Sequence, residues 1–259
     1  MTSNELGDAP MTDPAEEPAL PPKVKGPAEM PRYRVRIRFS KTGPLRFISH
    51  NDLLRLWDRM LRRTGLPIRS SEGFHQKTRL SSPLSLAVGL EAMEEIIDLE
   101  FTRPCSAEEV AELVKAEAPD GLGIVSADIL SVTQARQQVT QVEYACEFAS
   151  LFPKTEVEGR LLELMTSSSR IVCRQAPGKP DRHVDIRPFI DNIAATDRGL
   201  VILLHVRGGT TARPQEVLQV LGLGDPYQTG QVAITRRRVI MGTPPKPTDP
   251  SAAHGPLAV

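Results

Sequence analysis

Apolar residues and arginines alternate at the start of the patterned part of the chain. From Tyr33 to Ser40, apolar side chains occupy positions 33, 35, 37 and 39, and arginines occupy 34, 36 and 38. A period of two is typical of a β-strand that is buried on one face only. The pattern therefore predicts a strand with a basic outer face.

A helical period follows this strand. Between Ser49 and about Thr64, apolar residues recur every three or four positions, as on one face of an amphipathic helix. Ser49, with Asp52 three residues later, predicts an N-cap, and Gly65 and Pro67 predict the end of the helix. Four arginines share the opposite face: Arg55, Arg59, Arg62 and Arg63.

The remaining periodic segments alternate between strands and helices. We expect strands near residues 85–90, 95–102 and 124–132, and a helix over 106–116. The order then recurs, with strands at 139–150, 183–186, 200–206 and 231–241 and helices at 155–166 and 214–221. Strand, helix, strand, strand, helix, strand is the order of a ferredoxin-like unit.

We therefore expect an α+β protein built from two tandem ferredoxin-like (βαββαβ) units with antiparallel sheets. The first unit spans residues 31–135 and carries the basic helix face, and the second spans 136–242. Residues 1–30 are rich in proline and acidic residues, and residues 243–259 hold five prolines. We expect these ends to be a disordered acidic leader and a disordered proline-rich tail.

The composition limits the class of protein and its compartment. The 259 residues carry 32 basic and 32 acidic side chains, and the three cysteines lie far apart in the sequence. No apolar run reaches the roughly 18 residues of a membrane helix, and the N-terminus lacks the pattern of a secretory signal. We expect a cytoplasmic protein without disulfides, structural zinc or a membrane segment.

The zero net charge hides a strong asymmetry along the chain. Residues 31–80 hold 13 Lys and Arg against three acidic residues, whereas residues 81–131 hold two against eleven. Either the two segments neutralise each other across a sheet, or the first leaves a basic surface for an anion such as a nucleic acid. The planar fork of arginine suits phosphate, which favours the second interpretation slightly.

Two clusters are candidates for binding RNA. The first is the start of the predicted helix, where exposed backbone N–H groups attract phosphate, with plain capping as the alternative. The second is the loop 70–79, where an aromatic ring can stack on a base between cations, with an anchored polar loop as the alternative. The candidate residues are Arg46, Ser49, His50, Arg55, Arg59, Arg62, Arg63, Phe74, His75, Lys77 and Arg79.

The familiar catalytic motifs are absent from the sequence. It holds no GxxxxGK[ST], GxGxxG, HExxH or GxSxG pattern, and we expect no metal site. His50 and His75 are the candidates for general acid/base chemistry. Later in the chain, Asp185 and Arg187 are expected to form a structural cross-strand ion pair, and the arginines at 236–238 a solvated edge.

Several segments between about residues 32 and 240 are distinctive: FSKTGPLRFISHNDL, the Arg62-Arg63 pair before Gly65-Leu66-Pro67, Ser71–Phe74, Leu86–Gly89, Glu95–Glu100, VDIRPFI and Arg213–Leu218. Together they resemble the radical-SAM-linked family of unknown function, whose domain is fused behind cobalamin-type radical SAM proteins or stands alone. One departure is His75-Gln76-Lys77, where the family is expected to have Asn-Pro-His or similar.

The resemblance implies association with a radical SAM enzyme. This chain lacks the CxxxCxxC motif of such enzymes, so the iron–sulfur cluster and SAM would belong to the partner, and we expect no cofactor here. The leading hypothesis is a module, non-catalytic on its own, that binds RNA or presents substrate in tRNA or rRNA modification or processing. The alternatives are a metal-independent RNA-processing enzyme using His50 or His75 and an adaptor that docks on a radical SAM partner. Nothing in the sequence points specifically to DNA.

Overall fold

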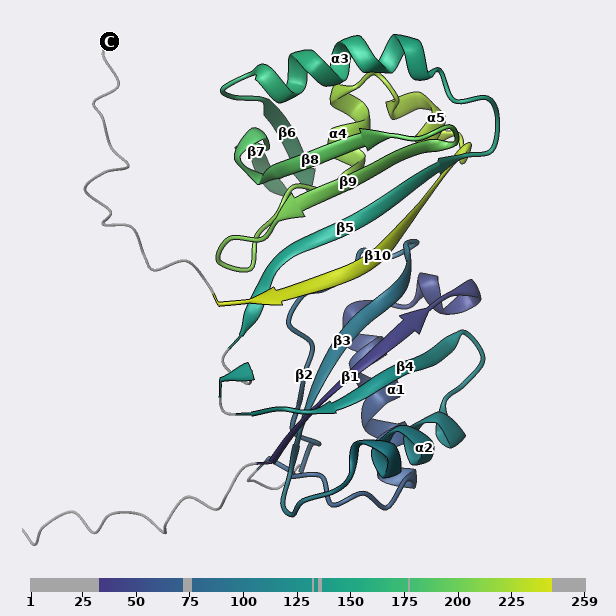
Figure 1. Ribbon diagram of the computed structural model, residues 1–259, viewed down its shortest axis with the longest axis vertical. Helices are drawn as coiled ribbons and strands as arrows, with labels where there is room; N and C mark the ends of the chain where they lie inside the picture. Colours follow the sequence, from purple (N-terminus) through teal and green to yellow (C-terminus); the bar gives the residue numbers. More distant parts are fainter. Residues whose placement is uncertain (1–32, 72–75, 132, 135–136, 177, 244–259) are drawn as a thin grey trace, which may run out of the picture. The chain divides into compact units, whose positions relative to one another are not determined.

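A computed structural model describes residues 33–71, 76–131, 133–134, 137–176 and 178–243 (Figure 1). Phe74 and His75, two of the candidate RNA-binding residues, lie outside the described residues, as do the predicted leader and nearly all of the predicted tail. Among the residues described, no helix is both long enough and apolar enough to cross a membrane.

The first half of the described chain begins with the predicted strand and amphipathic helix. β1 is Tyr33–Lys41, a 3₁₀ turn covers Gly43–Phe47, and α1 is His50–Arg63. The elements that follow are β2 (Leu80–Ser81), β3 (Glu91–Phe101), α2 (Ala107–Glu117) and β4 (Leu122–Ile129).

The second half contains more and shorter elements. In chain order they are β5 (Gln138–Phe148), α3 (Lys154–Thr166), β6 (Ile171–Ala176), β7 (Lys179–Asp185), a 3₁₀ turn at Arg187–Phe189, β8 (Ile190–Ala195), β9 (Gly199–His205), α4 (Pro214–Val220), α5 (Gly224–Gln228) and β10 (Val232–Gly242).

One sheet runs through both halves. Its strand order is β4-β1-β3-β10-β5-β9-β8, with β2 paired to β3 (Figure 1). The pairings within each half are antiparallel, and the halves meet in a short parallel contact that pairs Thr235 with Glu91 and Arg236 with Ala92. The fold is therefore mixed α+β with a mostly antiparallel sheet, as the sequence predicts at this coarser level.

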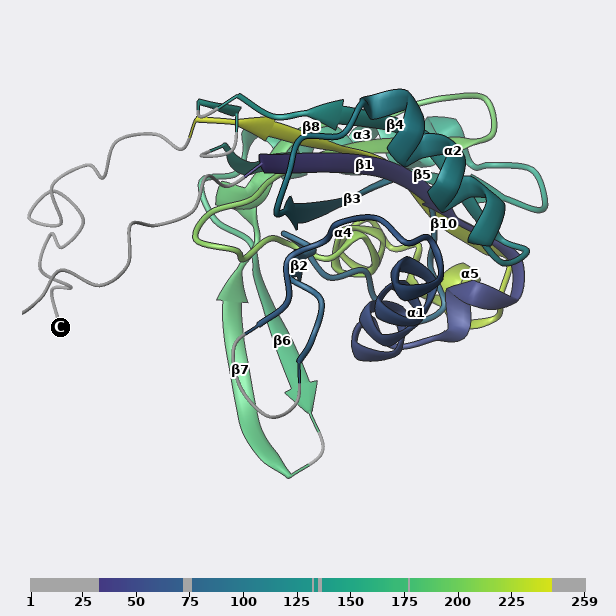
Figure 2. The same cartoon turned by 90° about the horizontal axis from the view of Figure 1, so that it is seen from below.

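Helices cover one side of this sheet. Figure 2 shows α1, α4 and α5 on the same side, from which the β6–β7 hairpin also projects. The two strands of this hairpin pair with each other in a small separate sheet. Side chains of period-two strands alternate between faces, so one parity of each main strand meets the helices and the other faces away from them.

Two apolar clusters form the core. In the first, the odd positions of β1 pack on Trp57 of α1 and on α2, and the rings of Phe39 and Trp57 meet edge to face with centroids 5.0 Å apart. The second joins β5, β9, β10, α3 and α4. β3 contributes to both, since Ile97 belongs to the first cluster and Ile96 to the second. The two cores therefore share a strand.

One strand prediction is wrong, and one predicted strand belongs to a different sheet from the one expected. Residues 85–90 do not form a strand. Leu86 and Leu90 are buried from an irregular segment, and between α1 and β3 the chain instead contributes the earlier, two-residue β2, which pairs with β3. The predicted strand at 183–186 lies within or just after β7, an arm of the separate hairpin, and the main sheet instead uses β8, which was not predicted. β8 buries only Ile190 and Ile193 and has an irregular register, so its period-two signal is weak.

Candidate anion-binding surface

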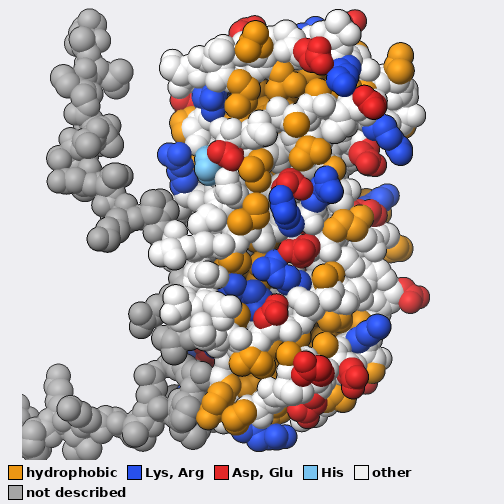
Figure 3. Space-filling view, in the orientation of Figure 1, with side chains coloured by type: hydrophobic (Ala, Val, Ile, Leu, Met, Phe, Trp, Pro, Cys, Tyr) orange, Lys and Arg blue, Asp and Glu red, His pale blue; other side chains and the backbone are white. Residues whose placement is uncertain are grey.

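The outer face of β1 is an ion-pair ladder. Its three arginines lie opposite a strand rich in acidic residues, because the antiparallel register of β1 and β3 places Arg34 against Glu100 and Arg36 against Asp98. Figure 3 shows this side of the molecule, where basic and acidic side chains intermix. The pairs are Arg34 with Glu100 at 3.2 Å, Arg36 with Asp98 at 2.7 and 2.8 Å, and Arg38 with Glu94.

Most other arginines of the basic segment are also paired. Two of them reach into the acidic segment and two bind acidic residues of their own helix. The pairs are Arg46 with Glu91 at 3.3 Å, Arg63 with Glu117 at 2.5 Å, Arg55 with Asp52 at 3.0 Å, and Arg62 with Asp58 at 3.1 Å. For these residues the first interpretation holds, because acidic side chains of the same fold neutralise the arginines.

The start of α1 is capped by its own side chains. The Asp52 backbone N–H donates to Ser49 Oγ at 3.2 Å, and Ser49 Oγ donates to Asp52 Oδ2 at 2.7 Å. The Ser49 hydrogen bond, together with Arg55, lowers the pKa of Asp52. Ser49 therefore acts as a cap in this structure. His50 begins the helix half-buried, and burial, with the charge of Lys41, lowers its pKa. A neutral imidazole at this position can donate and accept hydrogen bonds at neutral pH.

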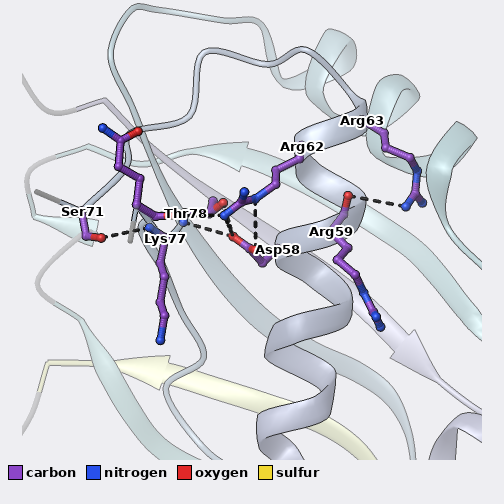
Figure 4. A network of polar contacts seen from close by, with 8 residues as sticks. Asp58, Arg59, Arg62, Arg63, Ser71, Lys77 and Thr78 are labelled. Carbon is purple, nitrogen blue, oxygen red and sulfur yellow. Dashed lines mark hydrogen bonds and ion pairs between the residues drawn. The ribbon is translucent and has the colours of Figure 1, made fainter. Parts of the chain in front are cut away.

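Asp58 joins α1 to the loop that follows it (Figure 4). Its Oδ1 accepts hydrogen bonds from Thr78 N at 3.1 Å and Thr78 Oγ1 at 2.5 Å. Arg62 completes the contact by donating to the Gln76 carbonyl at 2.9 Å. Burial raises the pKa of Asp58, but the hydrogen bonds from Thr78 and the charge of Arg62 outweigh it and lower the pKa overall. Arg62 thus has a structural role, holding the loop against the helix.

Apart from the buried Lys41, four cations of the basic segment stay outside these pairs among the described residues. Arg59, Lys77 and Arg79 are exposed and Arg69 is half-buried, and none has a side-chain partner among the described residues. Their backbone segments are adjacent: Arg79 N donates to Arg69 O at 2.7 Å, and Thr78, between Lys77 and Arg79, binds Asp58, the residue next to Arg59. We name these four residues the residual basic surface. Figure 4 shows the Arg59 and Lys77 side chains extending away from Asp58.

A buried ionic cluster lies where the two halves meet. Arg236 of β10 donates to both oxygens of Glu95 at 3.0 Å, to the Tyr144 hydroxyl at 3.2 Å and to the Ser85 carbonyl at 2.8 Å. Burial opposes the charge on Arg236, but Glu95 outweighs it and raises the pKa of Arg236. The expectation that residues 236–238 form a solvated edge is therefore wrong for Arg236, which is 2 % exposed.

Lys41 belongs to the same cluster. It is 1 % exposed, its Nζ lies 3.5 Å from the Ile48 carbonyl, and burial lowers its pKa, with Glu95 acting in the opposite sense and Arg236 in the same sense. Lys41, Glu95 and Arg236 are not among the candidate residues that the sequence indicates. The signal that could have found them is the alternation of side chains along each strand, which we call parity. Lys41, Glu95 and Arg236 each lie two positions from a buried apolar residue of the same strand, so their side chains point to the same buried face. Those apolar residues are Phe39, Ile97 and Ile234.

The predicted cluster around Asp185 is structural, although its contacts differ from the expected ion pair. Asp185 Oδ1 accepts from the backbone N–H groups of Arg170 at 2.8 Å and Arg187 at 3.0 Å. The Arg187 guanidinium donates to the carbonyls of Ile190 at 2.9 Å and Met165 at 2.8 Å. Both side chains thus satisfy backbone groups around the 3₁₀ turn. Within the described residues, no group of three His, Cys, Asp or Glu is placed to hold a metal ion.

These features define an α+β protein with a helix-covered sheet, ion pairs between neighbouring strands of that sheet, and a residual basic surface beside α1. Residues 34–215 match the family model DUF2344, described as an uncharacterized protein conserved in bacteria, and the chain belongs to this family. No curated protein matches the chain.

Proposed function

We propose that this protein is a cytoplasmic accessory module that binds RNA through the residual basic surface and presents it to a radical SAM enzyme in tRNA or rRNA modification or processing. One observation carries the proposal. Most basic residues of the segment are neutralised by acidic residues, yet Arg59, Arg69, Lys77 and Arg79 have no side-chain partner in the described chain and come from adjacent backbone segments.

Unpaired cations in one neighbourhood favour a polyanionic ligand. Phosphate contacts of Arg and Lys supply most of the sequence-independent affinity for nucleic acids, through release of condensed counterions. A cation already held by a carboxylate contributes less, because binding phosphate means giving up that partner. These contacts support the helix–loop region that Asp58 holds together as the proposed interface, rather than the helix face as a whole.

The strand order supports a finer description of the scaffold. Within the first half the order is β4-β1-β3-β2, and within the second it is β10-β5-β9-β8. Each is the 4-1-3-2 order of a βαββαβ unit, so we propose two tandem ferredoxin-like units, the second interrupted by the β6–β7 hairpin. Four-stranded sheets of this kind commonly bind RNA, which is an argument from fold alone.

The proposal is tested by RNA binding with salt titration. The variant R59E/K77E/R79E reverses three exposed charges, and we expect it to lose nearly all affinity for a fluorescent single-stranded RNA of about 12 nucleotides. For single strands each phosphate contact makes the slope of log affinity against log salt more negative by about 0.7, so four cations predict a slope of about −3.

The matched control is R103E/K115E/R182E, which makes the same charge change at exposed positions elsewhere. We expect the control to retain most of the wild-type affinity, because a general change in net charge acts weakly at physiological salt. Equal losses in the two triple variants, or wild-type affinity in R59E/K77E/R79E, would exclude the residual basic surface as the RNA site. Absence of RNA binding by the wild type would exclude the proposed function.

The radical SAM partner is the part of the proposal that rests on the sequence resemblance. In this arrangement the partner supplies the iron–sulfur cluster and SAM, and this chain supplies RNA. Purification of the tagged full chain from native cells at low salt tests it. A copurified radical SAM enzyme together with tRNA or rRNA is the expected result. That enzyme without nucleic acid would instead support an adaptor role.

A further inference from the structure

A groove opens where the two halves separate. β3 and β10 pair at only two positions, and further along β3 its neighbour is β2 instead (Figure 1). The groove has a volume of about 1220 Å³ and lies between β2, the ends of β5 and β9, and the turn at residues 207–209. It exceeds the roughly 300–1,000 Å³ of a typical small-molecule pocket, which suits a segment of a chain molecule.

The charges that line this groove leave a positive excess. Asp98 and Glu100 line it, but Arg36 and Arg34 neutralise them. Two other lining arginines, Arg79 from the first half and Arg207 from the second, are exposed and have no side-chain partner among the described residues. Arg79 also belongs to the residual basic surface, so the groove continues that surface onto the second half.

One rim of the groove holds polar side chains in fixed orientations. Gln141 and His205 are direct neighbours across the β5–β9 pairing, and both line the groove. Asp191 fixes both, because Gln141 Nε2 donates to its Oδ2 at 3.0 Å and His205 Nε2 lies 3.0 Å from its Oδ1. This leaves Gln141 Oε1 and His205 Nδ1 for other partners. Val139 and Met241 add apolar surface beside them.

We propose that this groove binds a segment of single-stranded RNA. Arg79 and Arg207 contact phosphates from the two sides, and Gln141 and His205 hydrogen-bond one base that lies against the apolar surface. Single-stranded recognition combines these elements, with cations on the backbone and polar and apolar groups on an unstacked base. The inference rests on the proposed function and extends it, since it places base contacts on the second half of the protein.

Charge complementarity favours RNA over a peptide in this groove. An extended peptide could pair with the edge of β10 beyond Arg236, where the described chain supplies no neighbouring strand. Such pairing needs backbone groups and pockets for side chains, and the positive charges of Arg79 and Arg207 contribute to it only when the peptide is acidic. A polyanion uses both.

Two variants of the full chain test the groove, with fluorescence anisotropy on single-stranded RNA of about 12 nucleotides. Arg207→Glu is expected to weaken binding about tenfold and to make the salt slope less negative by about 0.7, because a phosphate contact is lost. Gln141→Leu is expected to weaken binding about fivefold at an unchanged slope, because it removes an uncharged hydrogen bond. Thiouridine crosslinking of the same RNA should mark the peptide that contains residues 205–209.

Arg198→Glu is the matched control for Arg207→Glu, because Arg198 is also exposed on the second half and lies outside the groove. Wild-type affinity in both groove variants, alongside loss of binding in R59E/K77E/R79E, would overturn the groove and leave the proposed function standing. That outcome would favour a peptide in the groove. If the wild type binds no RNA, the proposed function and the groove inference fail together.

Discussion

At the scale of single residues, Lys41 is the least expected charge in the molecule. It ends β1 on the side of the strand that faces the core and is 1 % exposed. Lys41 and Arg236 carry two positive charges against the single carboxylate of Glu95, so the buried cluster holds an excess positive charge when all three are ionised. Burying a charge without full compensation is costly, and a lowered pKa is the usual result for a lysine.

The stability of the protein should therefore depend on pH through Lys41. Its folded-state pKa is below the ordinary value of 10.5, so between the two values the unfolded chain binds more protons than the folded one. The free energy of unfolding should rise with pH across that window. We expect the wild type to gain stability relative to Lys41→Met as the pH approaches 10.5, measured by urea unfolding of both proteins. Parallel pH profiles would show that Lys41 titrates normally.

Residue parity in the strands indicates buried charges as well as buried apolar side chains. The same alternation that predicts the buried face of β1 places Lys41 on that face, and the alternation of β3 places Glu95 inside. The sequence could not identify Arg236 as the partner of Glu95, because the two residues lie 141 positions apart in the chain. Parity indicates that a charge is buried, but only the tertiary structure shows what neutralises it.

At the scale of elements, α1 and its loop act as one unit. Asp58 on the helix accepts two hydrogen bonds from Thr78, and Arg62 reaches the Gln76 carbonyl. These contacts hold Lys77 and Arg79 in position beside Arg59. The loop therefore depends on a carboxylate that periodicity places on the polar side of the helix without assigning it a role.

Asp58→Asn should release the loop. An amide replaces the charged acceptor of two hydrogen bonds, so we expect a loss of about 1–2 kcal/mol in the free energy of unfolding at neutral pH. The loss should shrink as the pH falls through the lowered pKa of Asp58, because the wild-type carboxylate then becomes protonated. Hydrogen exchange at the Thr78 amide should accelerate. In Asp52→Asn, which alters the helix cap and the ion pair with Arg55 but not the loop, that amide should exchange as in the wild type.

Elements with strong local signals were predicted well, and those fixed by distant partners were not. The cap residue Ser49 and the apolar face of α1 lie within one segment, and its predicted bounds agree with the structure within two residues. β2 has two residues and exists because β3 offers an edge, whereas the apolar segment near Leu86 packs into the core without pairing. A period-two or apolar pattern cannot distinguish these outcomes.

At the scale of the whole molecule, the two halves are joined by more than their short strand contact. β3 supplies Ile97 to one core and Ile96 to the other, and Arg236 and Glu95 form a buried ion pair across the joint. Breaking a buried pair by removing one partner typically costs about 3–5 kcal/mol, because the other charge stays buried alone.

We expect the wild type to unfold in one cooperative step. Scanning calorimetry should give equal calorimetric and van't Hoff enthalpies. Arg236→Met should lower the free energy of unfolding by about 3–5 kcal/mol and broaden or split the transition, while Glu95→Leu/Arg236→Met should recover part of the loss. Two resolved transitions in the wild type would mean that the halves unfold independently.

The whole molecule also explains the charge asymmetry of the sequence. Each of the two interpretations of the charge asymmetry applies to a different set of residues. Neutralisation applies to the arginines of β1, which face carboxylates across the β1–β3 register. A free basic surface applies to the cations at 59, 69, 77 and 79, which have no side-chain partner within the described ranges. The register decides which arginines are neutralised, and register is a property of two strands together. Counting charges along one segment cannot separate the two groups.

The tip of the β6–β7 hairpin is a suitable site for inserting a tag or a label. The middle of the hairpin is anchored, because Arg174 of β6 binds Glu216 at 2.6 and 2.9 Å, whereas a Cβ added at Gly178, near the tip, would meet no atom of the described chain within 4 Å (Figure 2). A guest peptide inserted after Gly178 would leave the main sheet and both cores uninterrupted. An epitope or fluorescent label at this position would allow capture and imaging of the protein with both chain ends left native.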